Sequence, residues 1–507
     1  MIPTEGNPHP SFTVNTTDEK LLQAPDYSKY THSFDAYAYS GPTNGTYRID
    51  DQVFDVGQNF MTYERYVEYK EAGFTQYLSQ HTGVRINKDF CAERWEKEKI
   101  KMDAAHRAGL KVILTDQRLQ NLSKVGDSLI KRSDDDTEYR FASEEELDEF
   151  VQSCIALYKD HPAFYGLMLG DEPRGFHAKS YGITYRAIRR ALPDKFIQYN
   201  LLPMSMGYRD LIGERIPLLT AEEDDPRWTH FRREFARYEK YLNVYLDEMP
   251  GIEYLQYDVY PLHENLIDFN HIRNLQIAAK VCAKRNIDLH IVSQTFGMYK
   301  NGPNSHLYHR PPTKEDLHWM NNLLLGFGVK QINYFTYWTK CENSSTAEYF
   351  IDGASFVNYH GEKTPLYYQM QEIMANNQKF APVIKQFAYQ GCRVYVTSCV
   401  SCDTMYTEFV DNTYTFNKLK NVVFDKEIGF VSELYDKENK QYLYMLMNVV
   451  GGWLTCENAR QNITATFDKQ YTHAVVYKNG VGVAQKLHEN QFSVSLLPGE
   501  AVFVLPY

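Results

Sequence analysis

The sequence has little positive charge and no long apolar run. Its 507 residues contain 54 Lys and Arg against 65 Asp and Glu, which gives a formal net charge of −11 at pH 7. Because a nucleic-acid-binding surface needs clustered Lys and Arg to neutralise phosphates, this balance argues against a nucleic-acid partner. No apolar stretch approaches the roughly 20 residues that a membrane-spanning helix needs, so we expect no membrane span.

Cysteine is also scarce. The eight cysteines are scattered along the chain, far below the density of a disulfide-held scaffold. Cys399 and Cys402 have the spacing of a metal or redox pair, but no second pair accompanies them in a region predicted to form strands. The pattern favours two strand cysteines over a metal site, and a disulfide between them stays open.

The first residues show no basic region followed by an apolar core, so we expect no signal peptide in this sequence. The compartment stays open between the cytoplasm and, if a leader has been removed, the periplasm or the exterior. The oligomeric state stays open as well.

Aromatic residues, by contrast, are abundant. The chain has 40 Tyr and 28 Phe, and aromatic residues make up 14% of it. Aromatic faces pack against the C–H faces of sugar rings, and a tyrosine adds a hydroxyl group for hydrogen bonding. We expect most of these tyrosines in the core, so composition alone only favours a carbohydrate ligand.

Short apolar strands alternate with helices between residues 31 and 389. The predicted helices, such as 63–73 and 144–159, have amphipathic periodicity and glycine or acidic residues at the expected ends. Eight strands alternating with eight helices predict a (β/α)8 TIM barrel, with a doubly wound sheet as the alternative. The predicted strands are 33–40, 74–78, 111–115, 164–170, 196–202, 252–260, 289–294 and 331–338.

A period of two replaces this pattern at about residue 390. The alternation, bounded by turn residues, predicts an all-β sandwich. The predicted strands here are 393–397, 428–435, 441–447, 463–467, 474–477 and 492–506. We therefore expect an N-terminal tail over 1–30, the barrel over 31–389 and the β-sandwich over 390–507.

The fourth strand of the predicted barrel ends in Asp171, Glu172 and Pro173. A strand buried on both faces has no place for a charge until it leaves the sheet, and barrel active sites form at the carboxyl ends of the strands. By turn chemistry alone, the two carboxylates are equally well explained as caps of the following helix. The ends of the other strands add Tyr37, Tyr39, Asp116, Asn200, Tyr257, Asp258, Tyr260, Gln294, Tyr337 and Trp338.

These strand ends combine carboxylates, amides and aromatic rings. They contain no cluster of His or Cys for zinc, no Gly-rich phosphate loop, no serine nucleophile elbow and no lysine suited to a Schiff base. We therefore expect no metal and no cofactor. Cleavage of a glycosidic bond fits the set, because it needs one protonated acid and one group that stabilises or captures the positive centre.

Four stretches also carry a family resemblance. They are Asp171-Glu172-Pro173, Tyr334-Phe-Thr-Tyr-Trp-Thr339, Thr364-Pro-Leu-Tyr-Tyr-Gln369 and Leu497-Pro-Gly-Glu-Ala-Val-Phe-Val-Leu505. Together they resemble barrel glycoside hydrolases, specifically the β-galactosidase-like glycosidases of gut bacteria, over residues 31–507. The resemblance implies a carbohydrate substrate and Glu172 as the acid/base.

The chain departs from the best-known clan of these enzymes. That clan has Asn-Glu at the end of the fourth strand and a nucleophilic Glu at the end of the seventh, whereas this chain has Asp171-Glu172 and Gln294. A neutral amide cannot form a glycosyl ester, so the second catalytic group must come from elsewhere. Asp258 is one option, as a nucleophile about 5 Å from Glu172 or as a base about 6.5–9.5 Å away.

The other option is assistance by a 2-acetamido group of the substrate. Asp171-Glu172 is similar to the pair in β-hexosaminidases, and Leu255-Gln-Tyr-Asp258 is similar to the Met-x-Tyr-Asp of chitinase-like enzymes. This resemblance, which we favour slightly, implies that Asp171 and Tyr257 hold the acetamido group and that Trp338 lies beneath the sugar ring. The remaining lining candidates are Tyr37, Asn200, Tyr260, Gln294 and Tyr337. A non-catalytic carbohydrate-binding barrel is the third interpretation.

Overall fold

The computed structural model describes residues 18–49, 52–79, 92–125, 141–205, 230–264, 267–268, 270–302, 305–340, 347–396, 410–426, 428–450 and 459–507. The chain divides into two compact units. We call residues 35–312 and 331–371 the α/β unit, and residues up to 34, 313–330 and 372–507 the β unit. Cys399 and Cys402 lie outside the described residues.

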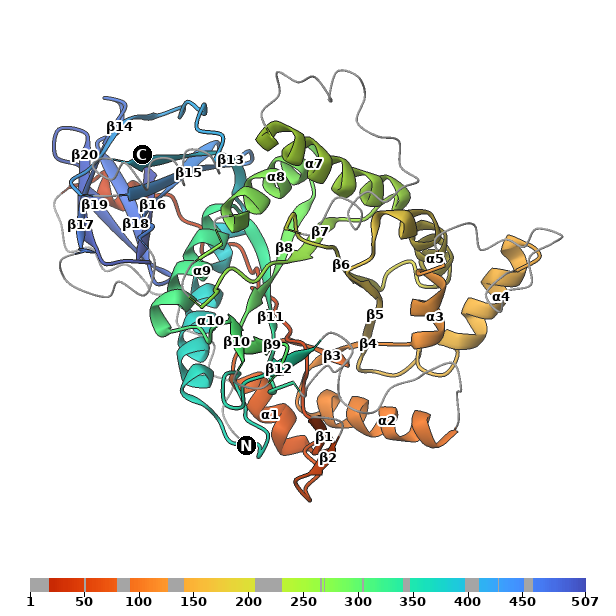
Figure 1. Cartoon of the computed structure of the whole chain (residues 1–507). Coiled ribbons are helices and arrows are strands. Elements are labelled where there is room, and N and C mark those ends of the chain that lie inside the picture. The colour runs from red at the N-terminus through yellow and green to blue at the C-terminus, as the bar shows by residue number, and fades with distance from the viewer. Residues whose placement is uncertain are drawn as a thin grey trace. The chain divides into compact units, whose positions relative to one another are not determined.

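Two sheets form the centre of the α/β unit (Figure 1). The first consists of β3 (Gln76–Ser79), β4 (Lys111–Leu114), β5 (Phe164–Asp171) and β6 (Phe196–Asn200), all parallel. The second consists of β7 (Tyr254–Asp258), β8 (Asp288–Gln294) and β11 (Val329–Phe335). The helices that cover these strands on the outside are α1 (Tyr63–Glu71), α2 (Ala92–Arg107), α3 (Gln117–Leu122), α4 (Glu144–Ile155), α5 (Ala178–Ala191), α7 (His230–Glu248) and α8 (Asn270–Arg285). The predicted alternation of strands and helices is therefore present.

Hydrogen bonds lead from one sheet to the other. Between β6 and β7, the N–H of Leu201 donates to the carbonyl oxygen of Gln256 at 3.0 Å. On the other side, the extended segment 36–39 lies between β11 and β3. The N–H of Tyr39 donates to Tyr334 O at 2.9 Å, and the N–H of Thr75 donates to Ala36 O at 3.1 Å.

This segment was predicted as the first strand of the barrel, but it has only an isolated bridge, between Ala38 and Tyr334. Side chains take the place of a regular ladder. The N–H of Ala38 donates to the Tyr69 hydroxyl at 2.7 Å, and the N–H of Tyr37 donates to Asn333 Oδ1 at 3.1 Å.

Glycine allows the neighbours of β5 to approach closely. A Cβ atom on Gly166 would lie 2.0 Å from the carbonyl oxygen of Phe196 in β6, and one on Gly170 would lie 2.8 Å from the ring of Tyr181 in α5. The end of β5 is thus fixed by β6 on one side and by α5 on another.

Several short strands have no counterpart in the sequence-based scheme. β1 (Thr46–Ile49) and β2 (Gln52–Asp55) form a hairpin. β9 (Met298–Lys300) pairs with both β10 (His306–His309) and β12 (Glu348–Phe350), so these three strands form a small antiparallel sheet.

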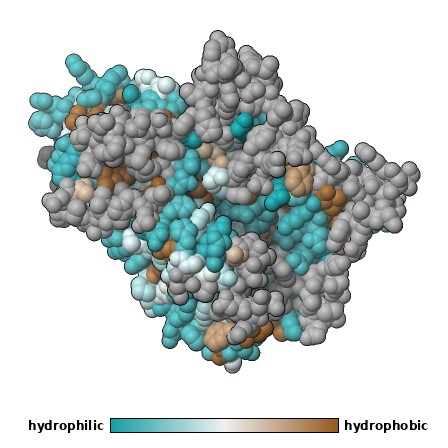
Figure 2. Space-filling model, viewed as in Figure 1, coloured by the Kyte–Doolittle hydropathy of each residue, from teal (hydrophilic) through white to brown (hydrophobic). Residues whose placement is uncertain are grey.

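The described atoms in the view of Figure 2 are mostly hydrophilic, with small separate apolar areas. One such area lies at the lower end, where the β1–β2 hairpin with its exposed Val53 and Phe54 is found in Figure 1. None of the described helices is both long and apolar enough to cross a membrane.

The β unit contains two antiparallel sheets that share an apolar core. Phe424, Leu446 and Ile463 belong to one buried cluster with side chains from both sheets. The larger sheet has the order β13 (Ala388–Val396), β15 (Ile428–Asp436), β16 (Gln441–Asn448), β21 (Ala501–Pro506), β18 (His473–Lys478) and β19 (Val481–Lys486). The smaller sheet has β14 (Leu419–Phe424), β17 (Gln461–Phe467) and β20 (Gln491–Leu496).

Helix α9 (Lys314–Gly326) and the part of α10 (Pro365–Ile384) from Glu372 onward belong to the β unit. Trp319 Nε1 donates to Val449 O at 3.3 Å, and the ring of Phe327 lies 5.4 Å from that of Phe430. The compact units therefore divide the chain at other places than the boundaries predicted at residues 30 and 389.

Candidate active site

Two carboxylates stand at the end of β5. Asp171 is its last residue and is half-buried, and Glu172 follows with a φ of 46°. The N–H of Glu172 donates to the carbonyl oxygen of Asn200 at 2.9 Å, so β6 holds this turn. A non-glycine residue in the left-handed region is strained, and such residues cluster at functional sites.

Neither carboxylate caps the helices that follow. The N-cap of the short 3-10 turn after β5 is Arg174, and the N-cap of α5 is His177. The cap interpretation of Asp171 and Glu172 is therefore wrong.

A polar network holds Asp171. Its Oδ1 accepts hydrogen bonds from Asn200 Nδ2 at 3.1 Å and from the Tyr39 hydroxyl at 3.4 Å. Gln198 Nε2 donates to the hydroxyls of Tyr39 and Tyr37 at 3.3 and 3.0 Å. Tyr37 is fully buried in the core, so it connects this network to the core.

Asp258 ends β7 and is 3% exposed. Its Oδ2 accepts a hydrogen bond from the Tyr260 hydroxyl at 2.9 Å, whereas its Oδ1 has no partner among the described residues. Burial, followed by the negative charge of Asp171, raises the pKa of Asp258 to about 6.

Glu172 is influenced strongly by these neighbours. The charge of Asp258, then the loss of surrounding water, then the charge of Asp171 raise the pKa of Glu172 well above its ordinary value. The residue is nevertheless exposed to solvent, while Asp258 is buried. The charge of Asp258 therefore favours the protonated form of Glu172.

Aromatic rings lie between the networks of Asp171 and Asp258. The half-buried ring of Phe335 lies 5.7 Å from that of Tyr39 and 5.6 Å from that of Tyr260. Phe296 packs edge-on against Tyr260 at 5.0 Å. The sequence analysis did not single out either phenylalanine, although Phe335 lies within the Tyr334–Thr339 stretch and Phe296 follows the predicted seventh strand by two residues.

The structure does not bring Tyr257 to the carboxylates. Successive strand residues point to opposite faces, so Tyr257 lies on the other side of β7 from Asp258. Its ring is fully buried and lies 6.3 Å from that of Tyr238 in α7. Its hydroxyl finds no partner in the described part of the chain.

Trp338 and Tyr337 are packed residues. Trp338 is 1% exposed, its Nε1 donates to the Tyr47 hydroxyl at 2.8 Å, and its ring lies 4.8 Å from that of Phe60. Tyr337 is also 1% exposed and packs against Tyr69 at 4.7 Å. Neither ring is accessible to a sugar in this structure.

Gln294 connects loops at the end of β8. Its Nε2 lies within hydrogen-bond distance of the carbonyl oxygens of Leu262, Phe296 and Arg310, at 3.3, 3.3 and 3.1 Å. Its Oε1 accepts from the Leu262 N–H at 3.0 Å. The amide therefore supports the loop backbone around the site.

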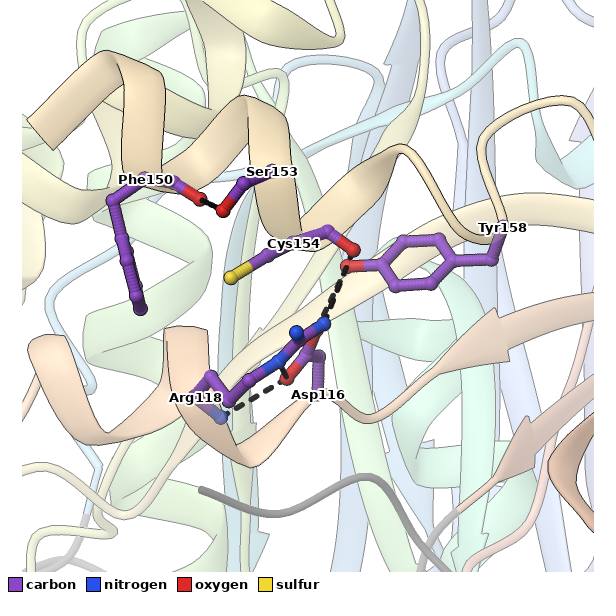
Figure 3. Close-up of polar contacts among 6 residues, drawn as sticks. All are labelled: Asp116, Arg118, Phe150, Ser153, Cys154 and Tyr158. Atoms are coloured by element: carbon purple, nitrogen blue, oxygen red, sulfur yellow. Dashed lines mark hydrogen bonds and ion pairs between the residues drawn. The ribbon is translucent and has the colours of Figure 1, made fainter. Parts of the chain in front are cut away.

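Asp116, after β4, is likewise occupied by structural contacts (Figure 3). It is the N-cap of α3 and accepts from the Arg118 N–H at 3.0 Å. The guanidinium of Arg118 adds two hydrogen bonds, at 3.0 and 2.7 Å, and the Tyr158 hydroxyl adds one at 3.1 Å. Asp116 is fully buried, and these contacts with Arg118 and Tyr158 compensate its buried charge.

The described residues contain no group of three or more His, Cys, Asp and Glu side chains that could hold a metal ion.

No protein-family model matches the chain, and no curated protein matches it. Similar folds are found among solved structures. One is a family 5 glycoside hydrolase from Bacteroides vulgatus (TM-score 0.48, 10% identity, covering 94% of this chain and 88% of that chain). Another is a family 27 β-L-arabinopyranosidase from Geobacillus stearothermophilus (TM-score 0.45, 10% identity, 96% and 98%). A third is a family 30 endoxylanase from Clostridium papyrosolvens (TM-score 0.42, 10% identity, 94% and 97%). At this distance, these similarities assign neither a family nor an activity.

Proposed function

We propose that the protein is a glycoside hydrolase in which Glu172 is the acid/base and Asp258 is the second carboxylate. The observation that carries this proposal is the electrostatic coupling of the two groups: the charge of Asp258 is the largest cause of the raised pKa of Glu172. One carboxyl that keeps its proton and one that loses it are the two components that glycosidic cleavage requires.

The proposed roles follow from exposure. Glu172 faces solvent and so can protonate the glycosidic oxygen as the bond to the anomeric carbon breaks. Asp258 then either attacks the anomeric carbon or removes a proton from the attacking water. If it attacks, Glu172 returns as a base and activates the water that hydrolyses the glycosyl ester. Asp171, held by Asn200 and Tyr39, is the positioning residue whose charge raises both pKa values.

We further propose that the α/β unit closes into a (β/α)8 barrel and that the β unit contains a β-sandwich. The bonds from Leu201 to Gln256, and from the segment 36–39 to both β11 and β3, support closure. The core cluster common to both antiparallel sheets supports the sandwich.

Assistance by a substrate 2-acetamido group is the second candidate. The adjacent Asp171 and Glu172 keep it open, because they provide the pair that such a mechanism uses. Tyr257 and Trp338 give it no support, since both are packed away from the carboxylates. We therefore place Asp258 ahead of it, in reverse of the order that the sequence favoured.

The test is hydrolysis of paired aryl β-glycosides, with and without a 2-acetamido group, by the parent, Glu172→Gln and Asp258→Asn. We expect turnover of plain glycosides that falls at least about 10³-fold in both variants, as loss of an essential acid or nucleophile does. Asp288→Asn is the matched control, because Asp288 is exposed at the opposite end of β8.

Each other outcome has a definite meaning. Turnover confined to acetamido sugars, with Asp258→Asn still active, would support the second candidate. Sugar binding that survives Glu172→Gln, without turnover by the parent, would show a carbohydrate-binding barrel.

A further inference from the structure

Lys340 lies beside the proposed site with its charge over two aromatic rings. Its Nζ is 5.2 Å from the ring centroid of Phe335 and 5.1 Å from that of Phe350. Its side chain is half-buried. Among the described residues, no carboxylate lies within ion-pair distance of Lys340, and its half-buried charge lies against the two rings.

The two rings connect Lys340 to the carboxylates. Phe335 packs against Tyr39 and Tyr260, whose hydroxyls donate to Asp171 and Asp258. The Phe350 ring lies 6.0 Å from that of Phe335. Phe335, Phe350 and Tyr260 are all half-buried and so present partly accessible aromatic surface.

A second lysine has the same arrangement in the small sheet of β9, β10 and β12. Lys300 Nζ lies 4.6 Å from the centroid of Tyr308, which packs against His309 at 4.5 Å. The His309 ring lies 6.0 Å from that of Tyr260. The charge of Glu348, the first residue of β12, adds to those of Asp258 and Asp171 in raising the pKa of Glu172.

We propose that Lys340 binds an anionic group of the substrate, which makes the substrate an acidic saccharide. The carboxylate or sulfate of a sugar would pair with Lys340 while Phe335 and Phe350 contact the apolar face of its ring. This inference rests on the proposed function. The physical reason is charge balance: the carboxylates of Asp171 and Asp258 repel an anionic substrate unless a cation compensates.

The experiment compares kcat/KM for an aryl β-glucuronide, a 6-sulfated aryl β-glucoside and the plain aryl β-glucoside. The variants are Lys340→Met, which keeps an unbranched stem without the charge, and Lys340→Arg, which keeps the charge. For Lys340→Met, we expect the acidic-to-neutral ratio of kcat/KM to fall about tenfold or more, the usual effect of losing a charge-assisted hydrogen bond. Lys340→Arg should retain most of the ratio.

The control is Lys111→Met. Lys111 also lies over an aromatic ring, that of Tyr165 at 5.0 Å, but at the beginning of β4 and therefore at the other end of the sheet. Lys111→Met should leave the acidic-to-neutral ratio of kcat/KM unchanged. The ratio is measured separately for the glucuronide and for the 6-sulfated glucoside. If only the glucuronide ratio falls in Lys340→Met, the anion is a carboxylate; if only the sulfated-glucoside ratio falls, it is a sulfate ester.

An unchanged ratio in Lys340→Met, together with turnover by the parent, would overturn the inference and leave the proposed function standing. If the parent turns over none of the substrates, calorimetry with glucuronate and glucose 6-sulfate separates the two proposals. Binding by the parent that Lys340→Met loses would keep the anion site and refute the hydrolase. Absence of binding would refute the anion site too.

Discussion

The side chains of Glu172 and Asp258 are chemically alike, but their surroundings differ in the way that the two proposed roles require. Asp258 is buried and accepts a hydrogen bond from Tyr260, which stabilises its ionised form. Glu172 is exposed and surrounded by negative charge, which stabilises its protonated form. Asp258 is the last residue of the extended strand β7, and Glu172 is a left-handed residue after β5.

The pH dependence of the reaction follows from this pair. In the proposed mechanism, the active form has Glu172 protonated and Asp258 ionised, so kcat/KM should fall as the pH decreases through about 6, where Asp258 takes up a proton. It should fall again at higher pH, where Glu172 loses its proton. Tyr260→Phe removes a donor to Asp258 and raises its pKa, so the acidic limb of the profile should move to higher pH.

The measurement is kcat/KM against pH for the parent, Tyr260→Phe and Tyr368→Phe. Tyr368 is 58% exposed in α10 and serves as the control that loses a hydroxyl elsewhere. An acidic limb that stays in place in Tyr260→Phe would show that Asp258 does not control it.

Residue order along the strands predicted part of this site. Asp171, Glu172, Asn200, Asp258 and Tyr260 were expected together, because parallel strands end on one face, and contacts or electrostatic coupling connect them in the structure.

The face of the strand on which each side chain lies could not be predicted in the same way. Tyr257 and Trp338 were placed at the site as strand-end residues, and their roles came from resemblance to short motifs. Neither argument states which face of the strand a side chain occupies or what packs behind it. The bond from Trp338 to the Tyr47 hydroxyl depends on a hairpin, β1–β2, that the sequence did not reveal.

At the scale of elements, the end of β8 holds the backbone of the loops around the candidate site. Gln294 occupies the position where the sequence comparison expected a catalytic carboxylate, and its amide contacts three carbonyl oxygens in three loops. A carboxylate in this place would face those oxygens with a negative charge and no donor.

Gln294→Glu should therefore destabilise the protein by about 3 kcal/mol without raising activity, because it buries a charge that has lost its partners. Urea unfolding and kcat/KM measure the two effects. Gln152→Glu, on the exposed face of α4, is the matched control and should change the free energy of unfolding by less than about 0.5 kcal/mol. An unaltered stability together with increased turnover would mean that the seventh strand can supply the nucleophile after all.

The regular strands and helices of the α/β unit were predictable because apolar residues recur along each of them at the spacing typical of a strand or a helix. The sheet of β9, β10 and β12 was not, because its strands are three or four residues long and pair across nearly fifty residues of sequence. Such strands are defined by their partners rather than by their own pattern, and here β12 carries Phe350, one of the two rings proposed to contact the substrate.

At the scale of the whole molecule, the β unit is discontinuous in sequence. It includes residues 313–330, which come between the two parts of the α/β unit. Trp319, Leu323 and Phe327 in this stretch are 0% exposed. The boundary expected at residue 389 was placed where the sequence period changes from that of helices to that of strands, and a change of period does not show which core a helix joins.

A chain of residues 31–389 should therefore fail to fold into a stable domain. It keeps α9 but loses Phe430, Val449 and Gly499, which contact Phe327, Trp319 and Asn322 in the whole chain. Exposing a large apolar side chain costs about 1.5–3 kcal/mol, so exposing Phe327 and Trp319 costs about 3–6 kcal/mol of the 5–15 kcal/mol by which a domain is usually stable.

The measurement is thermal unfolding with near-ultraviolet circular dichroism, in the truncated and the whole chain. We expect the truncated chain to lack a cooperative transition. Asn322→Ala in the whole chain is the control, because it removes only the bond of Asn322 Nδ2 to Gly499 O at 3.0 Å and should cost about 1 kcal/mol while folding persists. A truncated chain that unfolds cooperatively and retains kcat/KM would place the boundary at 389, and α9 would then have to be stabilised by the α/β unit alone.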